Sequence, residues 1–217
     1  MNARLDAKNM IMKLVIAGDV VNSQQHKSSS YIPVIEESLK RHALENRFVI
    51  YRGDSFQAVM TNPAQALRCI LEIKTGLKRT KGLDVRAAIG IGSVHIVDDA
   101  ISKSTGTAFS RSGSVLDRLK SLNQTIMVSS NHALDSYYNL ALKMALIFMD
   151  NWSANSASIL YESLKNPAYT QGELGNIFDI QQAAASRRLD RAHWKETQEL
   201  LHLFEQYCKD VGHGTLY

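Results

Sequence analysis

The stretch VIYRGDSFQAVM, residues 49–60, places a strong limit on how this chain can fold. Apolar and aromatic residues alternate on both sides of Gly53 and Asp54, and a Gly-Asp pair can form a tight turn, so the stretch predicts a β-hairpin. An aspartate at such a tip usually only shapes its own turn, because its side chain bonds the neighbouring main chain. A second Gly-Asp pair, Gly18 and Asp19, follows another apolar run and favours a functional role for both aspartates.

Composition indicates an ordinary globular protein. Of the 217 residues, 45% are apolar and 21% are charged, which argues against a disordered or fibrous chain and allows one or two domains. No apolar run approaches the roughly 20 residues that cross a bilayer, and the first ten residues lack the apolar core of a secretory signal. The two cysteines are far apart. We therefore expect a cytoplasmic protein with reduced thiols, no disulfide or zinc site, and no membrane partner.

The net charge of +4 is unevenly distributed along the chain. Residues 152–217 contain six Lys or Arg against eight Asp or Glu, so the positive excess belongs to the first 151 residues. This distribution favours a phosphate-bearing ligand in the N-terminal part. It does not favour a generally basic nucleic-acid surface in the C-terminal part.

The order of predicted elements up to residue 150 indicates an α+β fold. Residues 11–17 predict a buried strand, and Asp19 is expected just beyond its end, where α/β sheets tend to hold ligands. The further expected elements are a helix from Pro33, the hairpin strands at 47–51 and 55–60, a helix at 62–77, a strand at 85–97, a polar loop at 98–106, a segment at 107–120 that is helical from about Arg111, a strand at 125–130 and an apolar helix at 131–150. The two glycines at 90 and 92 predict a bulge or a close backbone approach. The last helix is expected to cover the sheet or to form a dimer contact.

Several of these segments together resemble a known family. The Gly18-Asp19 pair, GDSFQ at the hairpin, IGIGSV in the fourth strand and the following GTAFSRSG resemble the SatD-like family of bacterial proteins. The N-terminal domain of that family is similar to the class III nucleotidyl cyclase catalytic domain, which has a ferredoxin-like sheet and forms its site between two subunits. The resemblance covers most of residues 11–150. It implies a cyclase-like domain over residues 1–150 and a homodimer.

The resemblance also implies a metal site. In class III cyclases, one aspartate after the first strand and one at the hairpin hold two divalent ions that bind a nucleoside triphosphate. The matching positions here are Asp19 and Asp54, with the carbonyl of Val20 as a third ligand. Mg²⁺ or Mn²⁺ suits such a site, because these ions prefer a few carboxylates plus phosphate oxygens. A cation would also relieve the repulsion between two neighbouring carboxylates.

The helix expected after the fourth strand departs from the cyclase pattern. The positions of the transition-state Asn and Arg of cyclases are occupied here by Ser110 and Ser114. Serine cannot supply the charge that stabilises a pentavalent phosphate. Arg111 and Arg118 are candidate substitutes, although neither points the same way on a helix as position 114. Together with Ser55, where SatD-like sequences usually have Glu, these departures favour nucleotide binding over efficient cyclisation.

Residues 151–217 predict an all-helical second domain. Ser153 predicts the cap of one helix, and Thr170 with Glu173 forms a capping box that begins another. A short turn at Asp179 and Ile180 precedes a further helix. The segment TQGELGNIFDIQQAAASRRLDRA therefore resembles the helix-turn-helix of bacterial regulators and sigma-type factors, with Asp179 in place of the usual turn glycine.

The second helix of this motif carries side chains suited to DNA. Gln pairs with adenine edges, Arg pairs with guanine edges, and Arg, Lys and Ser contact phosphates. The candidate DNA-binding residues are Gln181, Gln182, Ser186, Arg187, Arg188 and Arg191, with Lys195 further on. The net negative charge of residues 152–217 favours an alternative, a trihelical protein-interaction domain whose arginines are simply solvated.

The sequence leaves three functions open. The leading hypothesis is a cytoplasmic transcription regulator, in which a cyclase-like domain binds a nucleotide or metal and a helix-turn-helix binds DNA. The second is a Mg²⁺- or Mn²⁺-dependent nucleotidyl cyclase or related phosphoryl-transfer enzyme that uses Asp19 and Asp54. The third is a protein-interaction adaptor.

Overall fold

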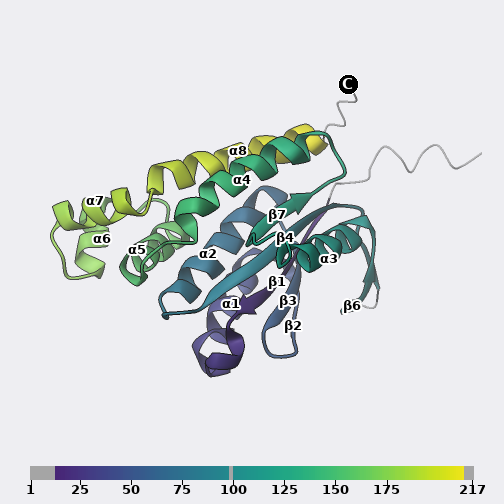
Figure 1. Ribbon diagram of the computed structural model, residues 1–217, viewed down its shortest axis with the longest axis horizontal. Coiled ribbons are helices and arrows are strands. Elements are labelled where there is room, and N and C mark those ends of the chain that lie inside the picture. The colour runs from purple at the N-terminus through teal and green to yellow at the C-terminus, as the bar shows by residue number, and fades with distance from the viewer. Residues whose placement is uncertain (1–12, 98–99, 213–217) are drawn as a thin grey trace, which may run out of the picture.

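A computed structural model describes residues 13–97 and 100–212 and shows an α+β protein whose helices cover a mixed sheet (Figure 1). The N-terminal part contains β1 (Lys13–Val21), α1 (Ile32–His42), β2 (Ala43–Tyr51), β3 (Ser55–Met60), α2 (Ala66–Lys78), β4 (Asp84–Gly92), β5 (His95–Val97), β6 (Ala100–Thr105), α3 (Thr107–Leu119), β7 (Ile126–Ser129) and α4 (Leu134–Met149). Short 3₁₀ turns occupy Ser23–Gln25, Ser28–Ser30 and Pro63–Gln65. The C-terminal part contains α5 (Ala154–Lys165), α6 (Gln171–Ile177), α7 (Gln182–Arg191) and α8 (Trp194–Gly212).

β1 is the central strand of a five-stranded sheet with the order β2-β3-β1-β4-β7. It pairs antiparallel with β3 and with β4, whereas β7 is parallel to β4. The predicted hairpin is formed by β2 and β3. Its positive φ angles fall on Arg52 (54°) and Gly53 (84°), so the turn is centred one residue earlier than the Gly53-Asp54 pair. Asp54 is therefore the last residue before β3.

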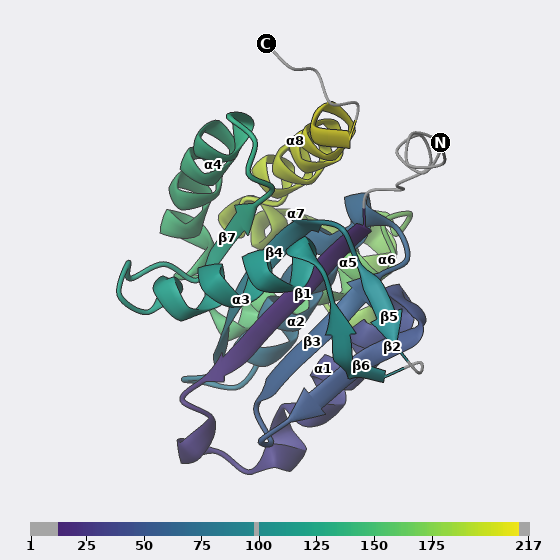
Figure 2. The same cartoon turned by 90° about the vertical axis from the view of Figure 1, so that its right-hand side faces the viewer.

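The two faces of the sheet have different covers. Because side chains alternate along a strand, Leu14 and Ile16 of β1 join Phe56 of β3 in the main core with α1 and α2. On the opposite face Val15 packs in a smaller cluster with Ala108 of α3, and Figure 2 shows α3 crossing in front of the strands. This second cover is partial, which leaves polar groups accessible near the hairpin tip.

Gly90 and Gly92 allow α3 to approach β4 closely. A Cβ atom on Gly90 would lie 2.1 Å from the carbonyl oxygen of Ala108, and one on Gly92 would lie 2.2 Å from Oγ1 of Thr107. Of the two explanations that the glycines allowed, a close backbone approach is thus the one observed.

Several boundaries differ from the sequence expectations, and β2 begins at Ala43 rather than at residue 47. β1 continues to Val21, because its pairing with β4 extends as far as Val21 opposite Asp84, so Gly18 and Asp19 lie inside the strand. The strand expected at 85–97 is divided into β4 and β5, and the polar loop expected at 98–106 contains β6, which pairs with β5. α3 begins at Thr107, earlier than Arg111. Residues 11, 12, 98 and 99 of these predicted segments lie outside the described residues.

The main core is continuous from the sheet to the C-terminal helices. It includes Leu67 of α2, Leu160 of α5, Leu189 of α7 and Phe204 of α8. Figure 1 shows α8 running alongside α4, where Tyr138 stacks on Tyr207 with ring centroids 4.8 Å apart. Within the described ranges, no helix combines the length and hydropathy needed to cross a membrane.

Candidate functional site

Asp19 and Asp54 line one pocket at the hairpin end of the sheet, with a volume of about 360 Å³. The pairing of β1 with β3 places Asp19 opposite Ser55, next to the hairpin tip. The N–H of Val20 donates to the carbonyl oxygen of Asp54 at 3.0 Å, which ties the tip to β1. The other lining residues are Val20, Asn22, Ser23, Gln24, Gln25, Ser55 and Arg86. The fold thus brings together the two aspartates that the sequence singled out.

The two carboxylates have different partners. Asp54 accepts hydrogen bonds from the hydroxyl of Ser23 at 2.6 Å and from that of Ser55 at 3.2 Å. Asp19 accepts from Nε of Arg86 at 2.9 Å, and the side chains of Asp19 and Arg86 are 29% and 25% exposed. Because water reaches both groups, this ion pair contributes at most about 1 kcal/mol. A divalent cation can therefore compete with the guanidinium for Asp19.

The donor set of the pocket fits a metal that arrives with phosphate. In an antiparallel strand the N–H and C=O of one residue point to the same neighbour, so the Val20 carbonyl faces the hairpin as its N–H does. Two carboxylates and one carbonyl are too few to complete the coordination shell of Mg²⁺. This ion usually takes its remaining ligands from water and phosphate oxygens. Among the described residues, no three His, Cys, Asp or Glu side chains form a group able to hold a metal.

Arg86 is the pocket residue that sequence reasoning missed. It lies on β4, directly opposite Asp19 on β1. Its Nε donates to Asp19, and a guanidinium can also bind a phosphate group through two N–H groups. Finding it from the sequence requires knowing that β4 pairs with β1 and in which register.

The polar residues of α3 lie outside this pocket in the described chain. The guanidinium of Arg111 donates to the carbonyl of Ile91, five residues along β4 from Arg86, which is roughly 16 Å in a strand. The hydroxyl of Ser110 donates to the Gly106 carbonyl at 3.4 Å, and Ser114 and Arg118 are exposed. Within one chain, α3 therefore supplies no cation to the two carboxylates.

The helix pair α6 and α7 forms a second candidate site, and its local geometry follows the sequence signals. The Thr170 hydroxyl accepts from the N–H of Glu173 at 3.2 Å, and the N–H of Thr170 donates to the Glu173 carboxylate at 2.8 Å. This backbone hydrogen bond, with a second from the Thr170 hydroxyl, lowers the pKa of Glu173. The predicted capping box is thus confirmed.

The turn between α6 and α7 is tight. Asp179 has the left-handed φ of 49° expected of a residue in the place of a turn glycine. The N–H of Ile180 donates to the Gly175 carbonyl at 2.9 Å. A Cβ on Gly175 would lie 2.7 Å from the carbonyl oxygen of Ile180, so a larger residue there would push the turn away from α6.

Most of the candidate DNA-binding residues on α7 and at its N-cap face solvent. Ala185 and Leu189 are buried, whereas Gln181, Gln182, Arg187 and Arg191 are exposed, and Ser186 and Arg188 are half-buried. Within the described residues, the guanidinium groups of these three arginines have no hydrogen-bonding or ionic partner. Figure 1 shows α7 at the opposite end of the molecule from β6. The helix is therefore open to a large partner.

No protein-family model matches this sequence, and no curated protein shows significant similarity to it. The features of the molecule that bear on its function are the pocket at Asp19 and Asp54 and the outer side of α7.

Proposed function

We propose that this protein is a cytoplasmic, DNA-binding transcription regulator that uses α7 as its recognition helix and senses a metal–nucleotide complex in the pocket at Asp19 and Asp54. The observation that carries the proposal is a set of three arginines on α7, Arg187, Arg188 and Arg191, whose guanidinium groups have no partner among the described residues. Arginines on one side of an exposed helix can contact phosphates and guanine edges, and Gln181 and Gln182 can contact adenine.

The strand order supports a class III cyclase-like, ferredoxin-like domain for residues 1–150. The first elements run β1-α1-β2-β3-α2-β4, and their strands are ordered β2-β3-β1-β4. A β-α-β-β-α-β unit is the basis of ferredoxin-like folds. The helices after residue 150, with their capped pair α6 and α7, support a helix-turn-helix domain over residues 151–217.

The chemistry of the pocket supports a nucleoside triphosphate or another nucleotide with Mg²⁺ or Mn²⁺. Asp19, Asp54 and the Val20 carbonyl would hold the cation, and Arg86 and Ser23 would face the phosphates. Cyclisation is less well supported, because it requires a further cation at the transition state and Arg111 is engaged by the Ile91 carbonyl. We therefore favour ligand sensing over catalysis at this site.

DNA binding can be tested by fluorescence anisotropy with genomic fragments over a range of salt concentrations. Arg187→Ala combined with Arg188→Ala should weaken binding and reduce the slope of log K against log salt by about 2. Lys81→Ala with Lys120→Ala is the matched control, because it removes the same charge from exposed positions in the N-terminal part. If the α7 variant binds with unchanged affinity and slope, α7 is not the recognition helix, and the adaptor hypothesis gains support.

Nucleotide binding can be tested by thermal unfolding with nucleoside triphosphates and Mn²⁺. A ligand at 100 times its Kd adds about 2.7 kcal/mol of stability, which corresponds to a rise in Tm of about 5–11 °C for a chain of this size. Asp54→Asn should abolish the rise, whereas Asp117→Asn, on the exposed side of α3, should keep it. Equal stabilisation of wild type and Asp54→Asn would place the ligand elsewhere.

A further inference from the structure

α4 carries a stripe of apolar side chains that faces solvent. Tyr137, Leu140, Met144 and Ile147 are 72%, 58%, 63% and 72% exposed. At about 100° per residue, these four side chains lie within an arc of about 80°. The opposite side of the helix is buried in the main core. A helix that is apolar on both sides normally has a partner on both sides.

The outer side of α4 also lacks the charges of a solvated helix. Among the residues of α4, only Asp135 and Lys143 are charged. The Asp135 carboxylate is already engaged, since it accepts from the Tyr207 hydroxyl at 2.6 Å and from the N–H of Asn131 at 3.0 Å. Lys143 is thus the single charge left on the exposed side of this helix.

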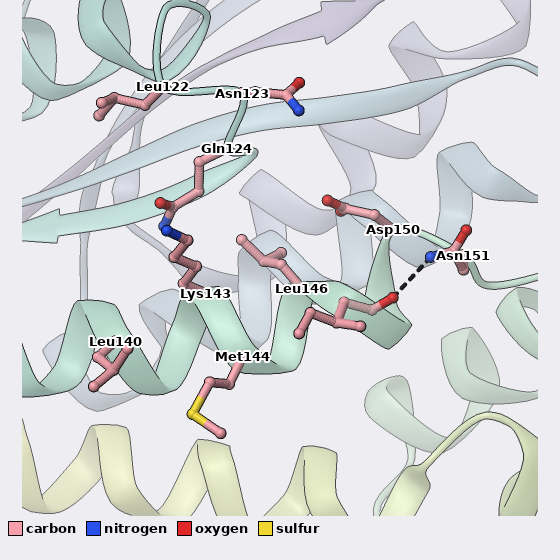
Figure 3. A pocket seen from close by; sticks show the side chains of 10 residues that line it. Leu122, Asn123, Gln124, Leu140, Lys143, Met144, Leu146, Asp150 and Asn151 are labelled. Atoms are coloured by element: carbon pink, nitrogen blue, oxygen red, sulfur yellow. Dashed lines mark hydrogen bonds between the residues drawn. The ribbon is translucent and has the colours of Figure 1, made fainter.

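The stripe borders a groove of about 460 Å³ between α4 and the loop at residues 122–124. Leu122, 47% exposed, extends the apolar surface across the groove. Figure 3 shows Asn123 and Gln124 across from α4, and Asp150 and Asn151 beyond the end of the helix. The groove therefore has a largely apolar wall along α4, a mixed wall at residues 122–124 and a polar end.

We propose that a second copy of this chain covers this surface, with α4 packed antiparallel against α4 of the other copy. The two-fold axis would cross the exposed side of α4 at the level of Leu142 along the helix. The spacing of the stripe is self-complementary about that position. Leu140 would face Met144 of the partner subunit, and Tyr137 would face Ile147 of the partner subunit. All four apolar residues then contact apolar residues, as an isologous interface requires.

The polar features of the groove fit the same arrangement. Tyr137 of the partner subunit would enter the groove beside Ile147, where Asp150 and Asn151 can bond its hydroxyl. Lys143 lines the groove about 80° from the centre of the stripe, at the edge of the apolar contact, where its flexible side chain can keep the ammonium in water.

The area predicts a dimer of moderate strength. Leu122 and the four residues of the stripe together expose on the order of 500 Å² in each copy, compared with about 800 Å² per partner in a standard interface. The polar residues around the stripe must supply the remaining buried area, so we expect a dissociation constant in the micromolar range. This dimer depends on neither DNA nor nucleotide.

Sedimentation equilibrium over a range of protein concentrations tests the proposal. Wild type should form a reversible dimer, and Met144→Glu with Ile147→Glu should raise its dissociation constant by about 100-fold or more. Ile177→Glu is the matched control, because Ile177 is also exposed (47%) but lies on α6. A monomeric wild type, or a dimer that persists in the α4 double variant, overturns the proposal.

Disulfide trapping tests the register independently. Leu140→Cys with Met144→Cys should give a covalent dimer under mild oxidation, since a disulfide needs Cα atoms within about 7 Å. Each single variant should remain uncross-linked, because position 140 is displaced from position 140 of the partner subunit. Cys69 and Cys208 are buried and give little background. Failure of the double variant to cross-link overturns the antiparallel register.

Discussion

Replacing Lys74 with Met should destabilise the protein strongly, because Lys74 is a fully buried cation that joins three elements. Its side chain is 0% exposed, and its Nζ donates to Asp84 on β4 at 2.8 Å and to Asp150 just after α4 at 2.6 Å. The hydroxyl of Thr125 lies 3.4 Å away. Met has a similar length and shape, so the substitution removes the charge with little change in volume.

The expected loss of stability depends on the positive charge and solvent that remain around the Asp84 and Asp150 carboxylates. Removing one partner of a buried ion pair costs about 3–5 kcal/mol, because the other charge is left uncompensated. Here Lys78 remains 3.0 Å from Asp84, and Asp150 is 36% exposed, so both carboxylates keep partial compensation. We therefore expect a loss near the lower end, about 3 kcal/mol, which corresponds to a fall in Tm of about 6–12 °C.

Urea unfolding followed by tryptophan fluorescence measures this loss. Asp150→Asn keeps an oxygen that can accept from Lys74, so it should cost only about 1 kcal/mol. The two variants and their combination form a double-mutant cycle that isolates the coupling between Lys74 and Asp150. A loss below about 1 kcal/mol for Lys74→Met would show that the buried network is not what joins α2 to the end of α4.

Three further outcomes are expected. Gly90→Ala should cost about 2–3 kcal/mol by urea unfolding, because its Cβ would meet the Ala108 carbonyl at 2.1 Å; an unchanged midpoint would contradict the close packing of α3. Burial raises the pKa of Cys208 to about 12 and that of Cys69 above its usual range, so both thiols should react with a thiol reagent only on unfolding; rapid reaction of native protein would contradict their burial. The Lys165 hydrogen bond lowers the pKa of Glu37, so its stabilisation is present above the unfolded pKa of about 4.3 and is lost as the pH falls. Glu37→Gln should remove this pH-dependent part of the free energy of unfolding, which is less than about 1 kcal/mol because the carboxylate is half exposed. If the free energy of unfolding of Glu37→Gln falls with acid just as in wild type, the role of Glu37 is contradicted.

Local signals predicted local structure well. The capping box at Thr170 and Glu173 and the cap at Ser153 depend on atoms a few residues apart, and both are present. The hairpin was predicted for the same reason, because alternation and turn residues act over short distances. Where the prediction missed, as at β6, pairing with β5 outweighs the polar composition of the segment.

Contacts between residues far apart in the chain were harder to predict from the sequence. The sequence singled out Asp19 and Asp54, but not Arg86, whose place opposite Asp19 depends on strand order and register. Similarly, the periodicity of α4 predicts an apolar helix without showing which side remains exposed. The ion pairs of Lys74 link residues that are distant in the chain, so only the folded structure shows them.

In the proposed function, the protein senses a nucleotide at Asp19 and Asp54 and responds through α7. This function is tested most directly by measuring DNA affinity with and without a nucleoside triphosphate and Mn²⁺, in wild type and in Asp54→Asn. A regulator should show a coupling within the usual range of about 5–150-fold, and Asp54→Asn should bind DNA with an affinity that the nucleotide no longer changes. DNA affinity that is identical with and without the nucleotide in wild type would contradict the proposed function.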